Sequence, residues 1–119
     1  IAFSDDLHTI GGNAFYGCSE LDKVTFSGTE HTLGDTDPGL TIDEMAFLQT
    51  GLTEIEFPED LKALGCHIFA ETNVSKMIFK GKNVPALLCY STGSPYFFGV
   101  ENEENIIKSE FFVKFCRIW

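Results

Sequence analysis

Cys66 and His67, which are adjacent in the chain, are the residues whose types could most readily support catalysis. A thiol beside an imidazole is the pairing that a cysteine nucleophile and its general base require. Adjacent residues in a short turn generally point apart, however, and no Asn or Asp is placed to orient the histidine. A hydrolase-like site at this pair is therefore a third hypothesis only. The chain has no GxGxxG, P-loop or HExxH motif, and we expect no enzyme and no catalytic residues.

Carboxylates gather at Asp35, Asp37, Asp43 and Glu44. Acidic residues at alternate positions are how calcium loops begin. Here Gly39 occupies the place of the next ligand and no Glu stands at the twelfth position, so the pattern indicates an acidic loop. His8 and His31 show no metal-ligand spacing. We expect neither a metal nor a cofactor.

The four cysteines show no CxxC pair and no regular spacing, at Cys18, Cys66, Cys89 and Cys116. A chain of this size that relied on disulfides would usually contain more of them. We interpret them as mostly free and buried, with a disulfide as the alternative. Cys18 is expected in the core, because it occupies the usual small apolar position of a repeat described below.

The composition indicates one folded domain over residues 1–119. Eight basic and eighteen acidic residues give a net charge of -10, which repels phosphate backbones and anionic headgroups. Nucleic acid and acidic membranes are therefore not expected as partners. No apolar run approaches the about 20 residues of a membrane span. The chain begins at Ile1 without a recognisable signal peptide, so we expect a mature or excised segment.

An apolar motif recurs three times, as IGGNAF at residues 10–15, IDEMAF at 42–47 and LGCHIF at 64–69. Each copy precedes an alternating stretch, VTF at 24–26, IEF at 55–57 and MIF at 77–79. Phe47 and Phe69 are 22 residues apart and Phe15 and Phe47 are 32 apart, so residues 27–39 contain an insertion of about ten residues. A period near 22 lies within the about 20–29 residues of leucine-rich repeats. The sequence therefore predicts a solenoid.

The expected fold class is α/β: a right-handed solenoid with a short parallel sheet and helical or 3-10 turns. Alternation predicts strands at residues 24–26, 55–57 and 76–79, each burying one face. Leu7, Ile10, Ala14 and Phe15 have near-helical spacing, enough for one or two turns. Three to four coils fill residues 1–82, where 1–3 resembles the end of a repeat strand. A degenerate coil and C-terminal cap occupy 83–119, with a last short strand at 106–107 and a capping helix from Ser109.

These segments, IGGNAFYGCSELDKVTF and LTEIEFPEDLKALG above all, resemble the BspA-like leucine-rich repeats across nearly the whole chain. The resemblance implies a right-handed, curved stack of coils with the sheet on its concave side. It also implies a secreted or surface-attached bacterial protein, although some members come from protists. Where a role is known in the family, it is adhesion to host matrix proteins, cells or other surface proteins. The family has no shared catalytic motif.

Outward positions on successive strands are the candidate ligand-binding residues of the concave sheet: Lys23, Thr25, Glu54, Glu56, Lys76 and Ile78. The alternative is that Lys23, Glu54 and Lys76 form a cross-strand charge ladder, worth about 0.2–1 kcal/mol per pair. Ile78 favours a binding surface, because an apolar residue facing solvent is unfavourable unless something covers it.

We therefore expect a non-enzymatic protein–protein interaction module, a fragment of an extracellular or cell-surface adhesin that binds host matrix or cell-surface proteins. The rival hypothesis is a structural spacer or C-terminal cap of a longer repeat array, with no binding site of its own. Self-association through the open N-terminal coil edge is a further expectation, because an exposed parallel edge can pair with another chain.

Overall fold

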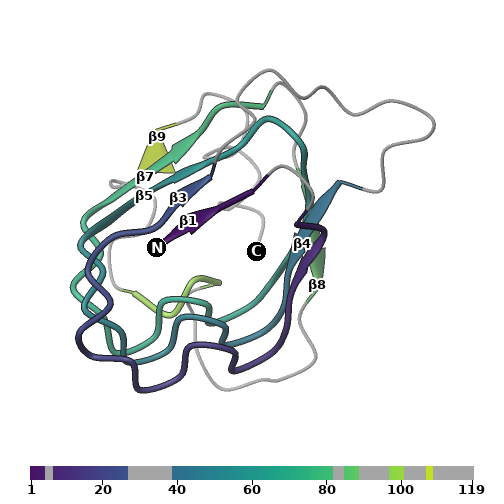
Figure 1. The fold of residues 1–119 in the computed structure, drawn as a ribbon. Helices are drawn as coiled ribbons and strands as arrows, with labels where there is room; N and C mark the ends of the chain where they lie inside the picture. Colours follow the sequence, from purple (N-terminus) through teal and green to yellow (C-terminus); the bar gives the residue numbers. More distant parts are fainter. Residues whose placement is uncertain (5–6, 27–38, 82–84, 89–96, 101–106, 109–119) are drawn as a thin grey trace.

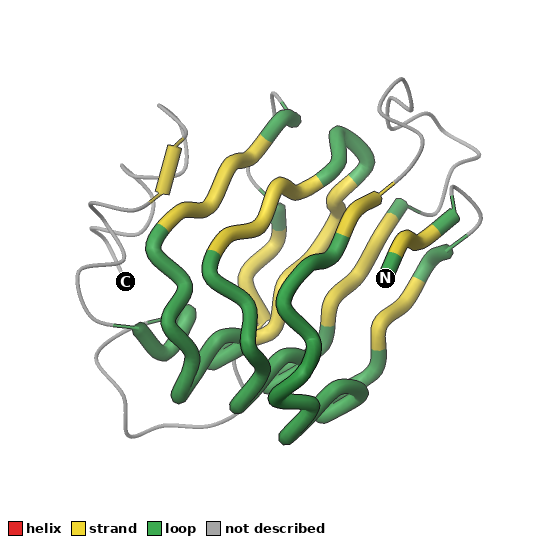
Figure 2. Tube along the Cα trace, turned by 60° about the vertical axis from the view of Figure 1, so that its left-hand side comes forward, coloured by secondary structure: helices red, strands yellow, loops and turns green. Residues whose placement is uncertain are grey.

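The repeats form coils that stack side by side around a common apolar interior (Figure 1). The structure is a computed structural model, and it describes residues 1–4, 7–26, 39–81, 85–88 and 97–100 and the backbone of 107–108. Each of the first three coils contains a strand, a turn segment and a second strand, at residues 7–26, 39–57 and 61–79. The view from the side in Figure 2 shows these coils stacked one beside the next.

One side of the stack is a parallel sheet with the strand order β2-β4-β6-β8. Its strands are β2 (Thr9–Ile10), β4 (Leu40–Ile42), β6 (Leu61–Gly65) and β8 (Ala86–Leu88). Ile10 pairs with Ile42 and Ile42 pairs with Leu64, so one position of the repeat forms a column of buried aliphatic side chains. A turn at residues 58–60, closed by the Leu61 amide donating to the Pro58 carbonyl, leads into β6.

The opposite side consists of two parallel sheets that are not hydrogen-bonded to each other. The first pairs β1 (Ala2–Phe3) with β3 (Thr25–Phe26), and the second has the order β5-β7-β9. Their remaining bounds are Glu54–Phe57 for β5, Lys76–Phe79 for β7 and Ile107–Lys108 for β9. Ile55 and Met77 point inward and the neighbouring charged residues point outward, as the alternation predicts.

Between the two strand sides, each coil bends through a turn segment that hydrogen-bonds to the next coil. The Phe15 amide donates to the Ala46 carbonyl at 2.8 Å, and the Phe47 amide donates to the Ile68 carbonyl at 3.1 Å. Residues in the left-handed region recur at the same positions of the repeat, at Asn13, Met45 and His67 and again at Gly17, Gln49 and Glu71. These residues interrupt right-handed geometry every few positions, so the segments cannot continue as helices.

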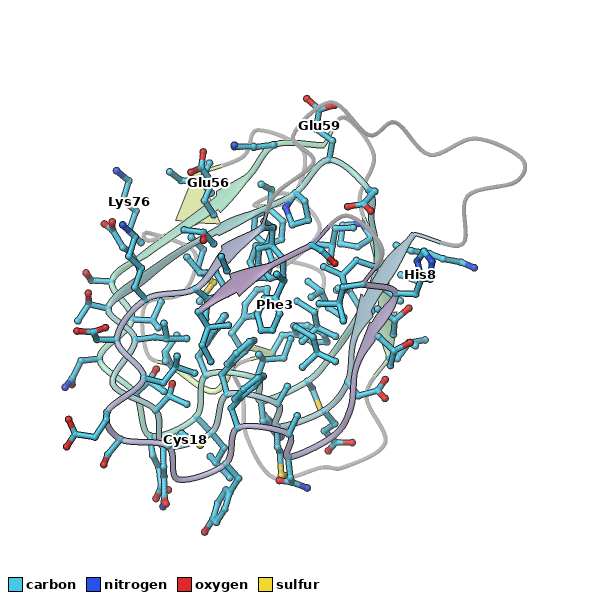
Figure 3. All side chains as sticks on the ribbon, in the orientation of Figure 1. Phe3, His8, Cys18, Glu56, Glu59 and Lys76 are labelled. Carbon is cyan, nitrogen blue, oxygen red and sulfur yellow. The ribbon has the colours of Figure 1, made fainter. Side chains whose placement is uncertain are left out.

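The core is a stack of phenylalanine rings contributed by successive coils. Phe15 lies on Phe47 with ring centroids 5.3 Å apart, and Phe47 lies on Phe69 at 6.0 Å. Phe98 continues the stack beside Phe69 at 6.2 Å, in the segment where the sequence predicts a degenerate coil. Figure 3 shows that side chains fill the interior of the coils, with Phe3 among them. Ring contacts of this kind contribute about 0.5–1.5 kcal/mol each beyond area burial.

Two expectations about secondary structure are wrong for the described residues. No helix or 3-10 turn forms there, because the near-helical spacing of Leu7 to Phe15 belongs to strand β2 followed by a left-handed turn. The single sheet is also replaced by three, since the segment before each Ala-Phe turn is itself a strand. The capping helix expected from Ser109 lies outside the described residues, and β9 starts one residue later than the strand expected at 106–107.

The cysteines also differ from expectation. Cys18 is exposed, because it lies on the turn segment of the first coil, against which no described coil packs on the N-terminal side (Figure 3). Its counterpart in the second coil, Thr50, is buried and its hydroxyl donates to the Phe47 carbonyl at 2.9 Å. Cys66 is disulfide-bonded rather than free, to a cysteine outside the described residues.

Candidate interaction groove

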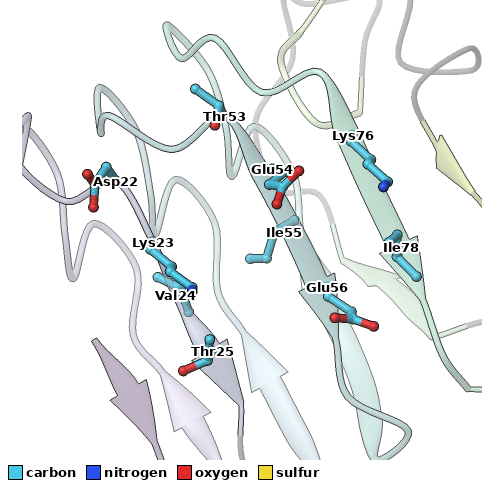
Figure 4. A pocket seen from close by; sticks show the side chains of 10 residues that line it. All are labelled: Asp22, Lys23, Val24, Thr25, Thr53, Glu54, Ile55, Glu56, Lys76 and Ile78. Carbon is cyan, nitrogen blue, oxygen red and sulfur yellow. The ribbon is translucent and has the colours of Figure 1, made fainter.

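The outward faces of β3, β5 and β7 enclose a hollow of about 370 Å³, called the β5 groove here (Figure 4). Ten residues line it: Asp22, Lys23, Val24, Thr25, Thr53, Glu54, Ile55, Glu56, Lys76 and Ile78. The strand alternation positions them, because a residue on either side of an inward one must face outward. All six candidate residues of the sequence, from Lys23 to Ile78, therefore line one hollow.

The β5 groove lies where the sheet is interrupted. The β5-β7 ladder is intact, and the Ser75 amide next to it donates to the Thr53 carbonyl at 2.8 Å. No ladder joins β3 to β5, although the same two coils are hydrogen-bonded to each other through the β2-β4 pairing and through their turn segments. The chain between these coils contains the insertion at residues 27–39 that breaks the 22-residue period, of which 27–38 lie outside the described residues. The interruption leaves Val24 and Ile55 as the apolar floor of the groove, and Figure 4 shows Ile55 extending from β5 toward β3.

The charges of the groove are mixed and mostly exposed. Three carboxylates and two ammonium groups line it, and Glu56 pairs with Lys80 at 3.2 Å with half of its side chain exposed. Glu54 and Lys76 are register neighbours on β5 and β7. Among the described residues, Lys23, Glu54 and Lys76 form no ion pair with one another. The charge ladder considered as an alternative is therefore not formed as a set of ion pairs, and these groups are open to solvent.

Four groove residues were not among the candidates of the sequence: Asp22, Val24, Thr53 and Ile55. Asp22 and Thr53 precede the strands by one or more residues, and Val24 and Ile55 were assigned to the core, where they are indeed buried. A signal for Thr53 is present in the sequence, because Ser75 is a similar hydroxyl residue at the same position of the next copy of the repeat. In the structure, Ser75 hydrogen-bonds to the Thr53 carbonyl. No sequence signal indicates that Val24 and Ile55 would also contact the groove.

The expectation that Cys66 and His67 point apart is wrong. Cys66 Sγ and His67 Nδ1 are 3.8 Å apart. The left-handed backbone of His67, with a φ of 58°, departs from the alternation of an extended chain and allows both side chains to lie on one side. Because Cys66 is disulfide-bonded, it is not a thiolate nucleophile in this state. The hydrolase-like hypothesis therefore has no attacking group here.

Only some of the other residues considered for chemistry lie within the described part of the chain. His8 is exposed beside β2, and His31 lies outside the described residues, as do Asp35 and Asp37. Asp43 and Glu44 line a second hollow of about 330 Å³ at the ends of β2, β4, β6 and β8. Of the four acidic residues of the calcium pattern, only these two are described, so the expectation of an acidic loop without calcium stays a prediction.

Parallel strands, a repeat of about 22 residues and a stacked apolar ladder define a leucine-rich-repeat type of solenoid. Residues 36–115 match the family model described as "BspA type Leucine rich repeat region (6 copies)". This is 80 of the 119 residues, and the chain belongs to this family. Leucine-rich repeats generally serve as protein-interaction modules without enzymatic activity, and the BspA type is generally associated with bacterial surface or secreted proteins.

Searches of curated proteins and of solved structures found no match to the chain. In the described part of the chain, no helix has the length and apolar character needed to cross a membrane.

Proposed function

We propose that the chain is a non-enzymatic interaction module that binds a protein ligand in the β5 groove. The observation that carries this proposal is the convergence of Lys23, Glu54 and Lys76 on one hollow without ion pairs among them. Charged groups left open in this way fix the register and orientation of a partner more than they stabilise the fold.

The groove is the centre of a larger contact surface. A stable protein–protein interface buries about 800 Å² on each partner, and a few central residues contribute most of the binding energy. Val24 and Ile55 supply an apolar floor, and Glu54 and Lys76 supply charges on its rim. A partner would place an apolar side chain on the floor and oppositely charged groups on the rim. The net charge of -10 favours a partner surface that is basic overall.

We further propose that the parent protein is a secreted or cell-surface bacterial adhesin and that the ligand is a host matrix or cell-surface protein. The family association with surface and secreted proteins supports this assignment. The expected localisation is accordingly extracellular or at the cell surface. The same proposal places the strands β3, β5 and β7, which carry the candidate residues, on the concave side of a curved stack.

The test is binding of the purified chain to a panel of immobilised matrix and cell-surface proteins. Glu54→Lys reverses one exposed charge in the groove, and Glu20→Lys makes the same change at an exposed residue outside it. Circular dichroism first confirms that both variants fold. We expect Glu54→Lys to weaken binding by about 2 kcal/mol, or about 30-fold, as at a central interface residue. The control variant should retain wild-type affinity.

A structural spacer or C-terminal cap is the second candidate function. The first coil and the residues before it favour this candidate, because Tyr16 is 53% and Ile1 is 56% exposed, more apolar surface than a coil inside a stack would leave open. Binding to no member of the panel would support this candidate. Equal loss of binding in Glu54→Lys and Glu20→Lys would also contradict the groove, because it would show a response to net charge alone. Sedimentation velocity would test whether the same edge pairs with a second copy.

A further inference from the structure

Strand register places one position of the repeat in a column at the edge of the stack. Ile10, Ile42 and Leu64 are register partners, so the residues two positions later, Gly12, Glu44 and Cys66, lie on successive coils. The Met45 amide next to Glu44 donates to the Cys66 carbonyl at 3.2 Å, so the two coils are hydrogen-bonded at this point. Glu44 and Cys66 are therefore direct neighbours although they are 22 residues apart in the chain.

Gly65 brings the two coils unusually close at this column. A Cβ at this position would lie 2.2 Å from the backbone nitrogen of Glu44, a distance that no side chain tolerates. His67 follows in the left-handed region, and its amide donates to the Phe97 carbonyl at 2.6 Å, which holds the turn in place. The backbone therefore positions the side chains of Glu44, Cys66 and His67 around a common point.

These three side chains have the geometry of a metal-ligand set. A Glu44 carboxylate oxygen, Cys66 Sγ and a His67 ring nitrogen all lie within 4.8 Å of one another. The sulfur and His67 Nδ1 are separated by 3.8 Å. In a tetrahedral zinc site with Zn–S of about 2.3 Å and Zn–N of about 2.0 Å, these two atoms are about 3.5 Å apart. The observed separation of sulfur and nitrogen is therefore close to that of two ligands on one zinc ion.

The redox state of Cys66 controls whether its sulfur can act as a ligand. In the disulfide, the sulfur is bonded to a second cysteine and carries no thiolate charge. Reduction by a phosphine consumes one water, breaks the S–S bond, leaves two thiols and gives the phosphine oxide. A bound divalent cation then displaces the thiol proton of Cys66.

We propose that the reduced chain binds a zinc-like divalent cation through Glu44, Cys66 and His67, and that the disulfide at Cys66 excludes this cation. Thiolate, imidazole and carboxylate together select a borderline-soft metal such as Zn²⁺ over calcium or magnesium. Glu44 lines a hollow of about 330 Å³ that Cys66 and His67 do not line, so a cation and a water as fourth ligand would reach the cluster from the side of the carboxylate. This site is separate from the β5 groove, so the inference does not rest on the proposed function.

The test is a Co²⁺ titration of the whole chain, because Co²⁺ reports a thiolate ligand by a charge-transfer absorption band. All samples have Cys18→Ser, which removes the exposed free thiol. We expect a band that saturates at one Co²⁺ per chain after phosphine reduction, no band in the oxidised chain, and loss of the band when Zn²⁺ is added. His67→Ala should lower the affinity for Co²⁺ by more than tenfold. Even the loss of a residue that only hydrogen-bonds to a metal ligand lowers metal affinity by about 10–100-fold. His8→Ala is the control, as an exposed histidine away from the cluster.

A band of equal strength in His67→Ala and in the reduced parent would overturn the proposal, because it would show binding by thiols alone. Equal binding by the oxidised chain would overturn the exclusion. Where reduction unfolds the chain, Zn²⁺ should restore the circular dichroism of the folded state, since metal binding contributes to folding. A reduced chain that stays unfolded with Zn²⁺ would also overturn the proposal.

Discussion

Phe69→Ala tests whether the ring stack is the core that holds the coils together. Phe69 is fully buried, and its ring contacts Phe47, Phe57 and Phe98 with centroids 6.0, 6.2 and 6.2 Å away. Replacing such a residue by alanine removes its transfer free energy and leaves a cavity, at a cost of about 3–5 kcal/mol. A domain of this size is stable by about 5–15 kcal/mol, so the variant should lose a large part of its stability.

Urea unfolding followed by circular dichroism measures this loss as a change in the midpoint at constant m-value. Phe15→Ala is the matched control, because Phe15 has the same repeat position and stacks on Phe47 but is only partly buried. We expect it to cost at least about 1 kcal/mol less than Phe69→Ala. Equal costs, or a cost below about 1 kcal/mol for Phe69→Ala, would refute the view that stacked rings between coils supply the stability.

Two further predictions concern the contacts that strand β6 makes with the coils on either side of it. Gly65→Ala should lower stability by about 1–3 kcal/mol or more, because its Cβ meets backbone of the neighbouring coil at 2.2 Å. Thermal unfolding beside Gly11→Ala, where nothing lies within 4 Å, checks this, and equal midpoints would contradict it. The register of β6 and β8 ends at Gly65 and Leu88, after which the sequence continues with Cys66 and Cys89. Peptide mapping without reduction should therefore find these two cysteines linked, and a link from Cys66 to Cys116 would contradict this prediction.

The repeat period was sufficient to predict the stack and its inward residues. Ile55 and Met77 were assigned to the interior from alternation alone, and both are buried by 98% or more. Alternation works here because a strand with one buried face leaves only two choices for each side chain. The same reasoning predicted the outward residues of β5 and β7, and so most of the β5 groove.

The turn segments could not be predicted in the same way. Asn13, Met45 and His67 all adopt the left-handed region, which costs about 1–3 kcal/mol for a residue with a side chain. No local preference of methionine indicates this conformation. It is stable because it aligns the following amides with the next coil, as in the bond from Phe15 to Ala46 at 2.8 Å. A hydrogen bond between residues 31 positions apart therefore determines the local backbone conformation. For this reason a helix predicted from the spacing of nearby apolar residues is wrong here.

The exposure of Cys18 could not be predicted from its position in the repeat. Its repeat position is buried at Thr50 in the second coil, so the pattern favours the core. Burial of this position depends on the coil that packs against it, and no described coil packs on that side of the first one. A repeat pattern predicts the direction of a side chain, whereas its exposure depends on which neighbours are present.

The interruption between β3 and β5 links the fold to its proposed function. The first coil is attached to the second by the β2-β4 pairing and by turn bonds such as that from Gly17 to Leu48 at 2.9 Å. These two sides are enough to hold the phenylalanine stack in register, so the third side does not need its ladder. A ladder there would draw β3 against β5 and reduce the space above Val24 and Ile55. Because no ladder between β3 and β5 depends on them, exposed charges such as Lys23 and Glu54 can change with little effect on folding, which is the condition a binding surface requires.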